Sequence, residues 1–230
     1  QERQHKIGDE VFRVEDWTVF HPQQEDRKIV NSASFHINAG EVVGFAGLMG
    51  AGRTEIAMSL FGKSYGTKHS GKVFKNGQEI SLNSVNESIE NGIIYLTEDR
   101  KNFGLVLIND IKTNICLANL KKISSNGVLN LNEEIIQSDE YRKQLSLRCT
   151  GLEQTVESLS GGNQQKVMLS KWLNADPKLL ILDEPTRGID VGAKYEVYSI
   201  INDLAANGTG ILLISSELEE LMGMCDRILV

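Results

Sequence analysis

Residues 47–54 read GLMGAGRT, and this glycine-rich stretch constrains the fold more than any other part of the sequence. It follows the apolar run EVVGFAG at residues 41–47, which predicts a buried strand. Residues 54–61 then place Ile, Ala, Leu and Phe at helical spacing, which predicts a helix. A strand, a glycine-rich loop and a helix in this order form the context in which a loop binds phosphate groups.

The loop departs by one residue from the pattern G-x-x-x-x-G-K-[ST], in which a lysine precedes the final hydroxyl residue. Gly47, Gly52 and Thr54 occupy the expected positions, and Arg53 stands where the lysine belongs. Arginine is a longer, planar cation, and it is not equivalent to lysine at a fitted phosphate. We predict that the loop binds a nucleotide through Gly47, Gly50, Ala51, Gly52, Arg53, Thr54 and Glu55.

The same glycines do not fit the alternative motif for dinucleotides, G-x-G-x-x-G. That motif would require glycine at position 55, which is Glu55. It also needs an acidic residue about 20 positions later to bind a ribose hydroxyl. The sequence there is Ser70-Gly71-Lys72, so we set the dinucleotide fold aside.

Apolar runs elsewhere predict that the glycine-rich loop belongs to an α/β fold with a parallel sheet. Residues 92–98, 179–184 and 210–215 are nearly continuous in apolar side chains. Such runs are typical of parallel strands that are covered on both faces. A helix predicted over residues 191–204 connects the last two of these strands in a β-α-β unit.

Two other regions follow different patterns. Residues 11–39 alternate between apolar and polar, and residues 70–82 read as a hairpin that turns at KNG (75–77). We expect these strands to form an antiparallel layer. Residues 105–158 carry Leu and Ile at helical spacing, with a break at SSNG (124–127), and predict an inserted helical lobe.

Composition and charge narrow the class of protein. The 230 residues carry a formal net charge of -7, which argues against a domain that follows a nucleic-acid backbone. No run of about 18 apolar residues is present to span a membrane, and the polar start QERQHKIGDE contains no secretory signal. Cys116, Cys149 and Cys225 form no C-x-x-C pair and fit small apolar residues better than a metal or redox site.

The second stretch that carries chemistry is LLILDEPT at residues 179–186. Its apolar residues deliver Asp183 to the carboxyl edge of a parallel sheet, where ligands bind in such folds. Asp183 can hold Mg²⁺ through water, and Glu184 can polarise an attacking water. An acidic pair that only caps the following turn is the structural alternative, and the phosphate loop upstream makes it the weaker one.

The third stretch is LSGGNQQKV at residues 159–167. Ser160, Gly161 and Gly162 precede a predicted helix over 164–173, so backbone N–H groups and the helix dipole face outward there. A serine N-cap would account for Ser160 alone, but not for the two glycines. This stretch resembles the signature motif of ATP-binding cassette (ABC) ATPases.

The resemblance extends over residues 11–230 and becomes narrower when four stretches are taken together. GLMGAGRTE, EDRK, LSGGNQQKV and DEPTRGIDVGAK resemble the second cassette of the tandem-cassette ATPases of bacterial monosaccharide import, of the ribose, galactose and xylose type. It implies a P-loop NTPase of ABC type, with a helical lobe near residues 99–158. We expect residues 1–10 to be a linker from a preceding cassette. Because the chain opens on Gln1 and closes on DRILV, we also expect truncation at the C-terminal end.

The same resemblance implies the cofactors and partners. ATP and Mg²⁺ would be bound, with Thr54, Asp183 and Glu98 as metal ligands. A second ABC cassette, transmembrane permease subunits and, indirectly, a periplasmic sugar-binding protein would be the partners, and nucleic acid would not. The location would be peripheral, at the cytoplasmic face of the cell membrane.

Three positions depart from the pattern of an active cassette. Arg53 replaces the loop lysine, Glu98 the glutamine after the middle strand, and Ser216 the histidine after the last strand. Glu184 is retained, and the predicted catalytic set is therefore Glu184, Ser216 and Glu98. Because misplacing one reacting group costs a large factor in rate, we expect nucleotide binding with slow hydrolysis at this cassette's own loop.

The remaining expectations concern contacts with adenine and with a partner cassette. The resemblance implies that an aromatic side chain near the end of the first strand stacks on adenine, and Phe20 and His21 are preferred over Trp17. Asp190 would communicate across the cassette pair, or serve as the N-cap of the next helix. The signature residues would complete the partner's nucleotide site. A non-catalytic regulatory module and a soluble ABC protein that acts on nucleic acid remain as alternatives.

Overall fold

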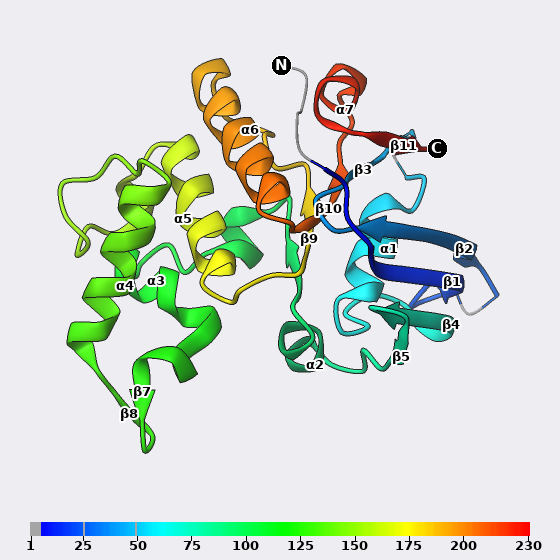
Figure 1. Cartoon of the computed structure of the whole chain (residues 1–230), viewed down its shortest axis with the longest axis horizontal. Helices are drawn as coiled ribbons and strands as arrows, with labels where there is room; N and C mark the ends of the chain where they lie inside the picture. Colours follow the sequence, from blue (N-terminus) through cyan, green and yellow to red (C-terminus); the bar gives the residue numbers. More distant parts are fainter. Residues whose placement is uncertain (1–5, 25, 49) are drawn as a thin grey trace. The chain divides into compact units, whose positions relative to one another are not determined.

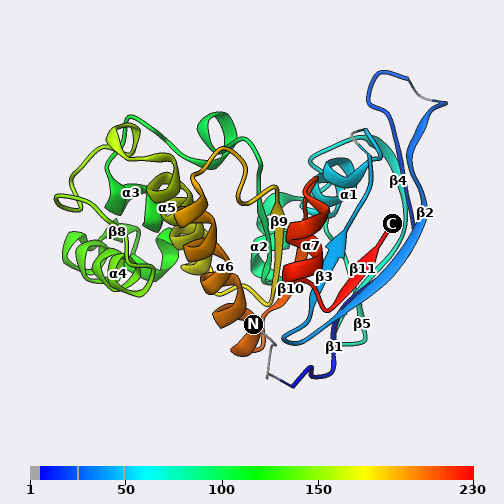
Figure 2. The same ribbon diagram turned by 90° about the horizontal axis from the view of Figure 1, so that it is seen from above.

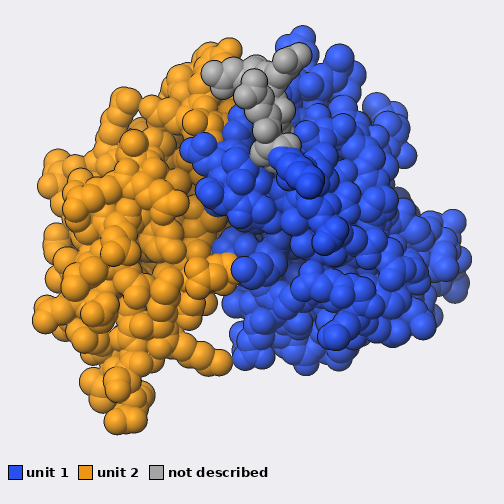
Figure 3. Space-filling model, viewed as in Figure 1, with its two compact units in different colours: residues 1–95, 177–184, 201–230 blue, residues 96–176, 185–200 orange. Residues whose placement is uncertain are grey.

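The computed structural model describes residues 6–24, 26–48 and 50–230, which fall into two compact units. Unit 1 contains residues 1–95, 177–184 and 201–230, and unit 2 contains residues 96–176 and 185–200 (Figure 3). Residues 1–5 of the predicted linker lie outside the described residues, and its last residue, Glu10, begins the first strand.

The larger sheet of unit 1 has the strand order β11-β3-β10-β9-β6. Strand β10 runs parallel to β3 and to β9, and β11 runs parallel to β3. Every residue of β6, β9 and β10 is buried, as their continuous apolar sequences predict. The bounds of the strands are Val42–Phe45 (β3), Ile93–Leu96 (β6), Leu179–Asp183 (β9), Gly210–Ile214 (β10) and Arg227–Leu229 (β11). The predicted parallel sheet is thus confirmed.

The second sheet of unit 1 is antiparallel, with the order β2-β1-β4-β5. Its strands are Glu10–Phe20 (β1), Lys28–Asn38 (β2), Thr67–Lys75 (β4) and Gln78–Ile80 (β5). Asn76 and Gly77, both with positive φ (49° and 77°), form the two-residue turn of the β4-β5 hairpin. Such a turn suits Asn-Gly because its twist matches that of the strands, and the hairpin predicted at residues 70–82 is confirmed.

Helix α1 (Arg53–Leu60) contacts strands of both sheets, β2 of the antiparallel layer and β9 of the parallel one. Figures 1 and 2 show it beside both sets of strands. The indole nitrogen of the buried Trp17 donates to Oγ of Ser59 at 2.9 Å, which fixes α1 to strand β1. The other helices of unit 1 are α2 (Val85–Glu90) and α7 (Leu218–Met224), together with the C-terminal end of α6 (Val191–Ala206).

Unit 2 is mostly helical and includes the range 99–158 that the sequence predicted as a lobe. Its elements are η1 (Arg100–Gly104), α3 (Ile111–Cys116), η2 (Leu117–Ile123), β7 (Ser124–Ser125), β8 (Val128–Leu129), α4 (Leu131–Gln144), η3 (Val156–Ser158) and α5 (Gly161–Leu173). The predicted break at 124–127 is the turn of the small β7-β8 hairpin. Unit 2 also takes in α5 and the first part of α6, which lie beyond the predicted lobe.

A buried ion pair joins α5 to α6 in unit 2. The Lys166 side chain is only 2% exposed, and its Nζ lies 2.7 Å from Oε2 of Glu196. The same ammonium donates to the carbonyl oxygen of Ser146 at 3.0 Å. Burying a lysine is costly unless its charge is paired and hydrogen-bonded, and both conditions hold here.

None of the helices in the described part of the chain combines the length and the apolar character that crossing a membrane requires.

Candidate functional site

The glycine-rich loop of unit 1 leads directly into helix α1, as the sequence predicted. Gly50 and Gly52 have positive φ values of 82° and 87°, which favour residues without a Cβ atom. Gly52 is the N-cap of α1, and no side chain caps the first N–H groups. Since these N–H groups carry the positive end of the helix dipole, the start of α1 is suited to bind an anion. Met49 lies outside the described residues.

Arg53, which replaces the expected lysine, reaches from the loop to the end of strand β10. Its Nη1 atom donates to the carbonyl oxygen of Ser215 at 2.6 Å. One donor of the guanidinium is therefore used inside unit 1, while the guanidinium has five donors in all. Among the described residues, the guanidinium makes no other hydrogen bond, so its remaining donors can serve an anion at the loop.

The carboxyl end of strand β9 presents the two predicted acids. Asp183 is completely buried, and the hydroxyl of Tyr95 on β6 donates to its Oδ2 atom at 2.9 Å. The backbone then turns sharply, because Glu184 has a positive φ of 47° and donates its N–H to the carbonyl of Ile214 at 2.9 Å. A non-glycine residue in this region is strained, and such strain concentrates at functional sites.

Glu184 and Ser216, both predicted as catalytic residues, are in contact. Oγ of Ser216 donates to Oε2 of Glu184 at 3.2 Å. Burial raises the pKa of Glu184 above its ordinary value, while hydrogen bonds from Ser216 and the charge of Arg53 act in the opposite direction. Arg53, Glu184 and Ser216 therefore belong to one site in unit 1, although they are far apart in sequence.

The residues at this edge fit a nucleotide with its magnesium ion. Thr54 and Asp183 would offer oxygen ligands, which Mg²⁺ prefers, and Mg²⁺ usually needs only one or two protein ligands besides phosphate and water. In the described part of the chain, no group of three or more His, Cys, Asp or Glu side chains could hold a metal by itself. The loop and Asp183 therefore suit a metal that arrives with its phosphates.

A cavity lies beside the glycine-rich loop. This cavity has a volume of about 620 Å³ and is lined by residues 29–31, 33–35, 45–48, 51–53, 56, 229 and 230. Neither Phe20 nor His21 lines it. The Phe20 ring lies beneath the ammonium groups of Lys28 and Lys68, and Nδ1 of His21 accepts from the Gln23 N–H at 3.1 Å.

In unit 2, Ser160 forms the N-cap of α5, which is the role that the alternative to a signature motif gave it. Its exposed Oγ accepts from the N–H of Asn163 at 3.4 Å and from Nδ2 of the same residue at 2.9 Å. A Cβ atom at Gly162 would lie 2.6 Å from Cβ of Ala193, so only glycine allows α5 to approach α6 this closely. The paired glycines, which capping does not explain, thus have at least one steric cause.

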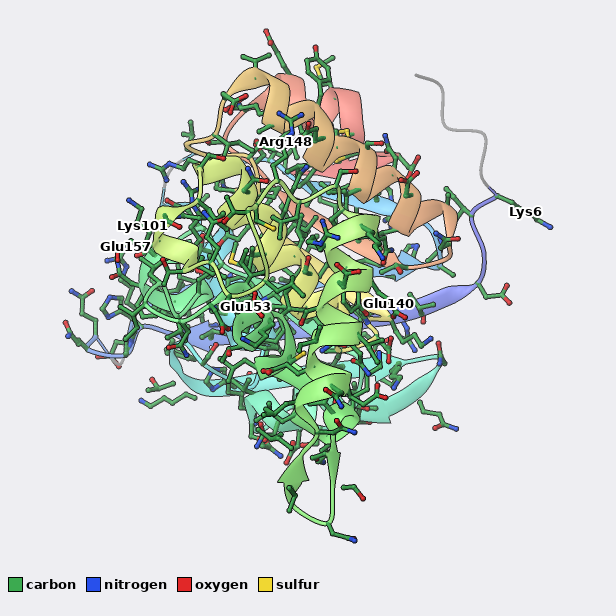
Figure 4. The ribbon with its side chains drawn as sticks, turned by 90° about the vertical axis from the view of Figure 1, so that its left-hand side faces the viewer. Lys6, Lys101, Glu140, Arg148, Glu153 and Glu157 are labelled. Atoms are coloured by element: carbon green, nitrogen blue, oxygen red, sulfur yellow. The ribbon has the colours of Figure 1, made fainter. Side chains whose placement is uncertain are left out.

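Asp190 is the N-cap of α6, because its Oδ1 accepts from the N–H of Ala193 at 3.0 Å. A small cavity of about 150 Å³ lies at the adjacent starts of α5 and α6, and Ser160, Asp190 and Arg148 are among its lining residues. Arg148, labelled in Figure 4, is paired with Glu196 at 3.1 Å. Two helix N-termini therefore open toward the same small cavity.

Comparison with known proteins decides the family. Residues 30–187 match the family model described as "ABC transporter". The chain belongs to this family. The cassette also matches a solved nucleotide-free ATP-binding cassette from an ABC transporter, with a TM-score of 0.79 at 19% identity over 95% of this chain and 86% of that one. That likeness confirms the fold, a P-loop ABC type with a parallel sheet, an antiparallel layer and helices.

Curated relatives of the cassette carry sugar-transport names. It is 57% identical to an L-arabinose transport ATP-binding protein of Geobacillus stearothermophilus, over 98% of this chain and 44% of the relative. It is 49% identical to a xylose import ATP-binding protein of Thermoanaerobacter pseudethanolicus, over 98% and 45%. A ribose import ATP-binding protein of Caldanaerobacter subterraneus is also 49% identical, over 97% and 43%. The chain thus spans less than half the length of these relatives.

Glu98 of the cassette lies in unit 2, where its carboxylate forms an ion pair with the guanidinium of Arg187. Sequence reasoning singled out Glu98 but missed Arg187, and it also missed Tyr95 as the donor to Asp183. The sequence contains a signal for each of these two residues. Tyr95 interrupts the aliphatic run of β6, and Arg187 is a cation beside the predicted acid pair.

Proposed function

We propose that this chain is the ATP-binding cassette of a bacterial monosaccharide importer. It binds MgATP and couples ATP hydrolysis, within a pair of cassettes, to sugar uptake through separate permease subunits at the cytoplasmic face of the membrane. A second cassette, carried on the same polypeptide, and a periplasmic sugar-binding protein complete the assembly. The sugar-transport names of the relatives, at 49–57% identity, support the pentose class of substrate.

The observation that carries the nucleotide site is the meeting of Arg53, Glu184 and Ser216. Arg53 leaves the phosphate loop and bonds to Ser215, while Ser216 bonds to Glu184. These three residues come from three separate segments, and the fold gathers them beside the uncapped start of α1. Such convergence of a cation, a carboxylate and free N–H groups is what phosphoryl chemistry requires.

Each residue of unit 1 has a distinct task in this proposal. The loop N–H groups and the spare donors of Arg53 bind phosphate oxygens, and Thr54 and Asp183 hold the magnesium ion. A magnesium ion held there would neutralise charge on the phosphates. Glu184 accepts the proton of the attacking water, and a raised pKa makes this carboxylate a better base than an ordinary glutamate. Ser216 positions Glu184 through its hydrogen bond.

The loop substitutions limit hydrolysis at this cassette's own site. Arg53 donates one hydrogen bond to the carbonyl of Ser215. Its guanidinium can therefore move with a reacting phosphate less freely than the ammonium of a lysine would. The N-terminal end of α5, which carries the signature residues, is better suited to contact a nucleotide than the loop is to hydrolyse one. Ser160 is exposed there, and Gly161 and Gly162 have no side chains that would cover the start of the helix. We propose that this end, with Asp190, completes the nucleotide site of the partner cassette.

One observation favours a second candidate function, a nucleotide-binding cassette without turnover of its own. The hydrogen bond from Arg53 to the carbonyl of Ser215 already occupies part of the guanidinium that stands in place of the catalytic lysine. A regulatory cassette would bind nucleotide and stabilise the pair, and its Glu184 would have no proton to accept.

The test is MgATP binding by titration calorimetry, with phosphate release followed in the same samples. We expect binding with slow release, and we expect Arg53→Gln to weaken binding by about tenfold, since a charged hydrogen bond contributes about 1.5–3 kcal/mol. Arg13→Gln is the matched control, because Arg13 is held by Glu10 and Glu15 on strand β1. Binding without any release would support the regulatory candidate, and a chain that binds no MgATP would refute the proposal.

A further inference from the structure

The ion pair of Glu98 joins two segments of unit 2 that are 89 positions apart in sequence. Glu98 lies in the turn after strand β6, and Arg187 lies in the TRGID segment after strand β9. Both side chains are partly exposed, at 39% for Glu98 and 56% for Arg187. An isolated, partly exposed ion pair contributes little to the free energy of folding. Its structural effect therefore depends on other bonds between the same two segments.

Arg100 supplies two further hydrogen bonds between the same segments. Its Nη1 donates to the carbonyl of Arg187 at 3.0 Å, and its Nη2 donates to the carbonyl of Gly188 at 3.4 Å. Residues 98–100 therefore bind Arg187 twice. Glu98 accepts from its side chain, and Arg100 donates to its backbone carbonyl. Three charge-assisted bonds hold the TEDRK turn (97–101) to the TRGID segment (186–190). The TRGID segment donates one of them, and the TEDRK turn donates the other two.

The same cluster lies against the start of the signature helix. A Cβ atom at Gly161 would be 3.1 Å from Nη2 of Arg100 and 3.3 Å from the carbonyl oxygen of Gly188. Glycine at position 161 therefore lets the Arg100 guanidinium and the TRGID backbone approach the N-terminus of α5. Three segments that the sequence keeps apart meet at this point within unit 2.

We propose that Glu98, Arg100 and Arg187 form a latch that makes the TEDRK turn and the TRGID segment move as one body. Glu98 is then a positioning residue and not a metal ligand, because its carboxylate serves Arg187. Glu98 carries a negative charge where the family pattern has a neutral glutamine, and the cation of Arg187 in the same unit compensates that charge. A displacement of the TEDRK turn is transmitted to Asp190 and to the start of α5. This last consequence rests on the proposed function, whereas the latch itself does not.

Hydrogen exchange of the chain without nucleotide tests the latch directly. We expect Glu98→Gln to speed amide exchange in residues 186–190, and Arg187→Gln to speed it in residues 98–103. The expected change is about threefold to tenfold, in the lower part of what coupling between contacting residues produces, because both side chains of the pair are partly exposed. Arg142→Gln is the matched control, because Arg142 is paired with Asp139 on α4 in the same unit. Exchange that rises only in the mutated segment would overturn the proposal.

A double-mutant cycle in the same assay adds a second criterion. If the pair acts as a latch, Glu98→Gln combined with Arg187→Gln opens both segments no more than either single change does. Effects that multiply would mean that the two residues act independently. This readout needs no ATP, so its failure is distinct from a failure of the proposed function.

The role of Glu98 in metal binding is decided with MgATP. We expect the Mg²⁺ concentration that gives half-maximal nucleotide binding to be the same, within about twofold, in Glu98→Ala and in the unchanged chain, because the Glu98 carboxylate is paired with Arg187. Alanine has no oxygen that could replace a carboxylate ligand. A rise of about tenfold or more in Glu98→Ala, with no rise in Arg187→Gln, would identify Glu98 as a metal ligand and refute the latch assignment.

Discussion

The hydrogen bond from Ser216 to Glu184 makes the acid strength of Glu184 depend on a residue 32 positions away. We predict that Ser216→Ala raises the pKa of Glu184. A hydrogen bond to the ionised form of a carboxylate favours that form, so the bond lowers the pKa. Burial of Glu184 acts in the opposite direction and remains in the variant. The variant therefore moves Glu184 further from the ordinary glutamate value.

The size of the effect follows from the geometry. A hydrogen bond to a charged group contributes about 1.5–3 kcal/mol when it is buried. The contact is long for an O–H donor at 3.2 Å, and Ser216 is exposed, so water replaces part of the lost bond. We discount the contribution to about 1 kcal/mol. The deprotonated fraction of Glu184 at an acidic pH should then fall by about fivefold.

The assay is a pH titration of ¹³C-labelled glutamate carboxyl groups by NMR, with Glu184→Gln to assign the signal. Ser64→Ala is the control, because Ser64 is an exposed serine of unit 1 whose hydroxyl donates to the backbone carbonyl of Met58. A midpoint that stays in place or falls in Ser216→Ala would show that the bond does not form in solution. The link between Ser216 and the acid would then have to be abandoned.

Three further predictions concern stability and the signature end. Glu184→Gln should stabilise the chain by up to about 1 kcal/mol at pH 7 in urea unfolding, after allowance for partial exposure. Because the folded-state pKa is raised, the gain should disappear as the pH falls below the ordinary value of glutamate. Ser160→Ala should cost about 1 kcal/mol of unfolding free energy through the lost N-cap, whereas Ser160→Asp should keep the cap and still depress ATP turnover of the assembled cassette pair by repelling phosphate. Glu196→Ala should cost about 1–2 kcal/mol in thermal unfolding, because it leaves the buried ammonium of Lys166 without its carboxylate. Unchanged stability in that variant would mean that water already reaches Lys166.

Much of unit 1 could be predicted from local patterns. The apolar runs that form β3, β9 and β10 lie where their continuity indicated, and the Asn76-Gly77 turn forms the expected hairpin. These features are local, since periodicity and turn chemistry depend on residues that are close in sequence. The phosphate loop was found for the same reason, because its glycines, the strand and the helix are contiguous.

The pairing of the site residues could not be predicted, although Tyr95 and Arg187 stand out in the sequence. The sequence marked Glu98 as a departure from the family pattern, but its partner Arg187 is 89 positions away. The adenine contact stays a prediction, since Phe20 and His21 were chosen by position and neither lines the cavity beside the loop. The extent of the helical part was also incomplete, because α5 joins unit 2 through packing that periodicity does not reveal.

The sequence by itself determined the elements, the phosphate loop, the acid pair and the signature stretch, and therefore the family. The tertiary structure decided which group each charged side chain meets. Arg53 meets the carbonyl of Ser215, Glu184 the hydroxyl of Ser216, and Glu98 the guanidinium of Arg187. The physical reason is that backbone conformation follows from interactions within a few residues, whereas the strength and acidity of a charged side chain depend on the groups that the fold brings to within about 4 Å of it.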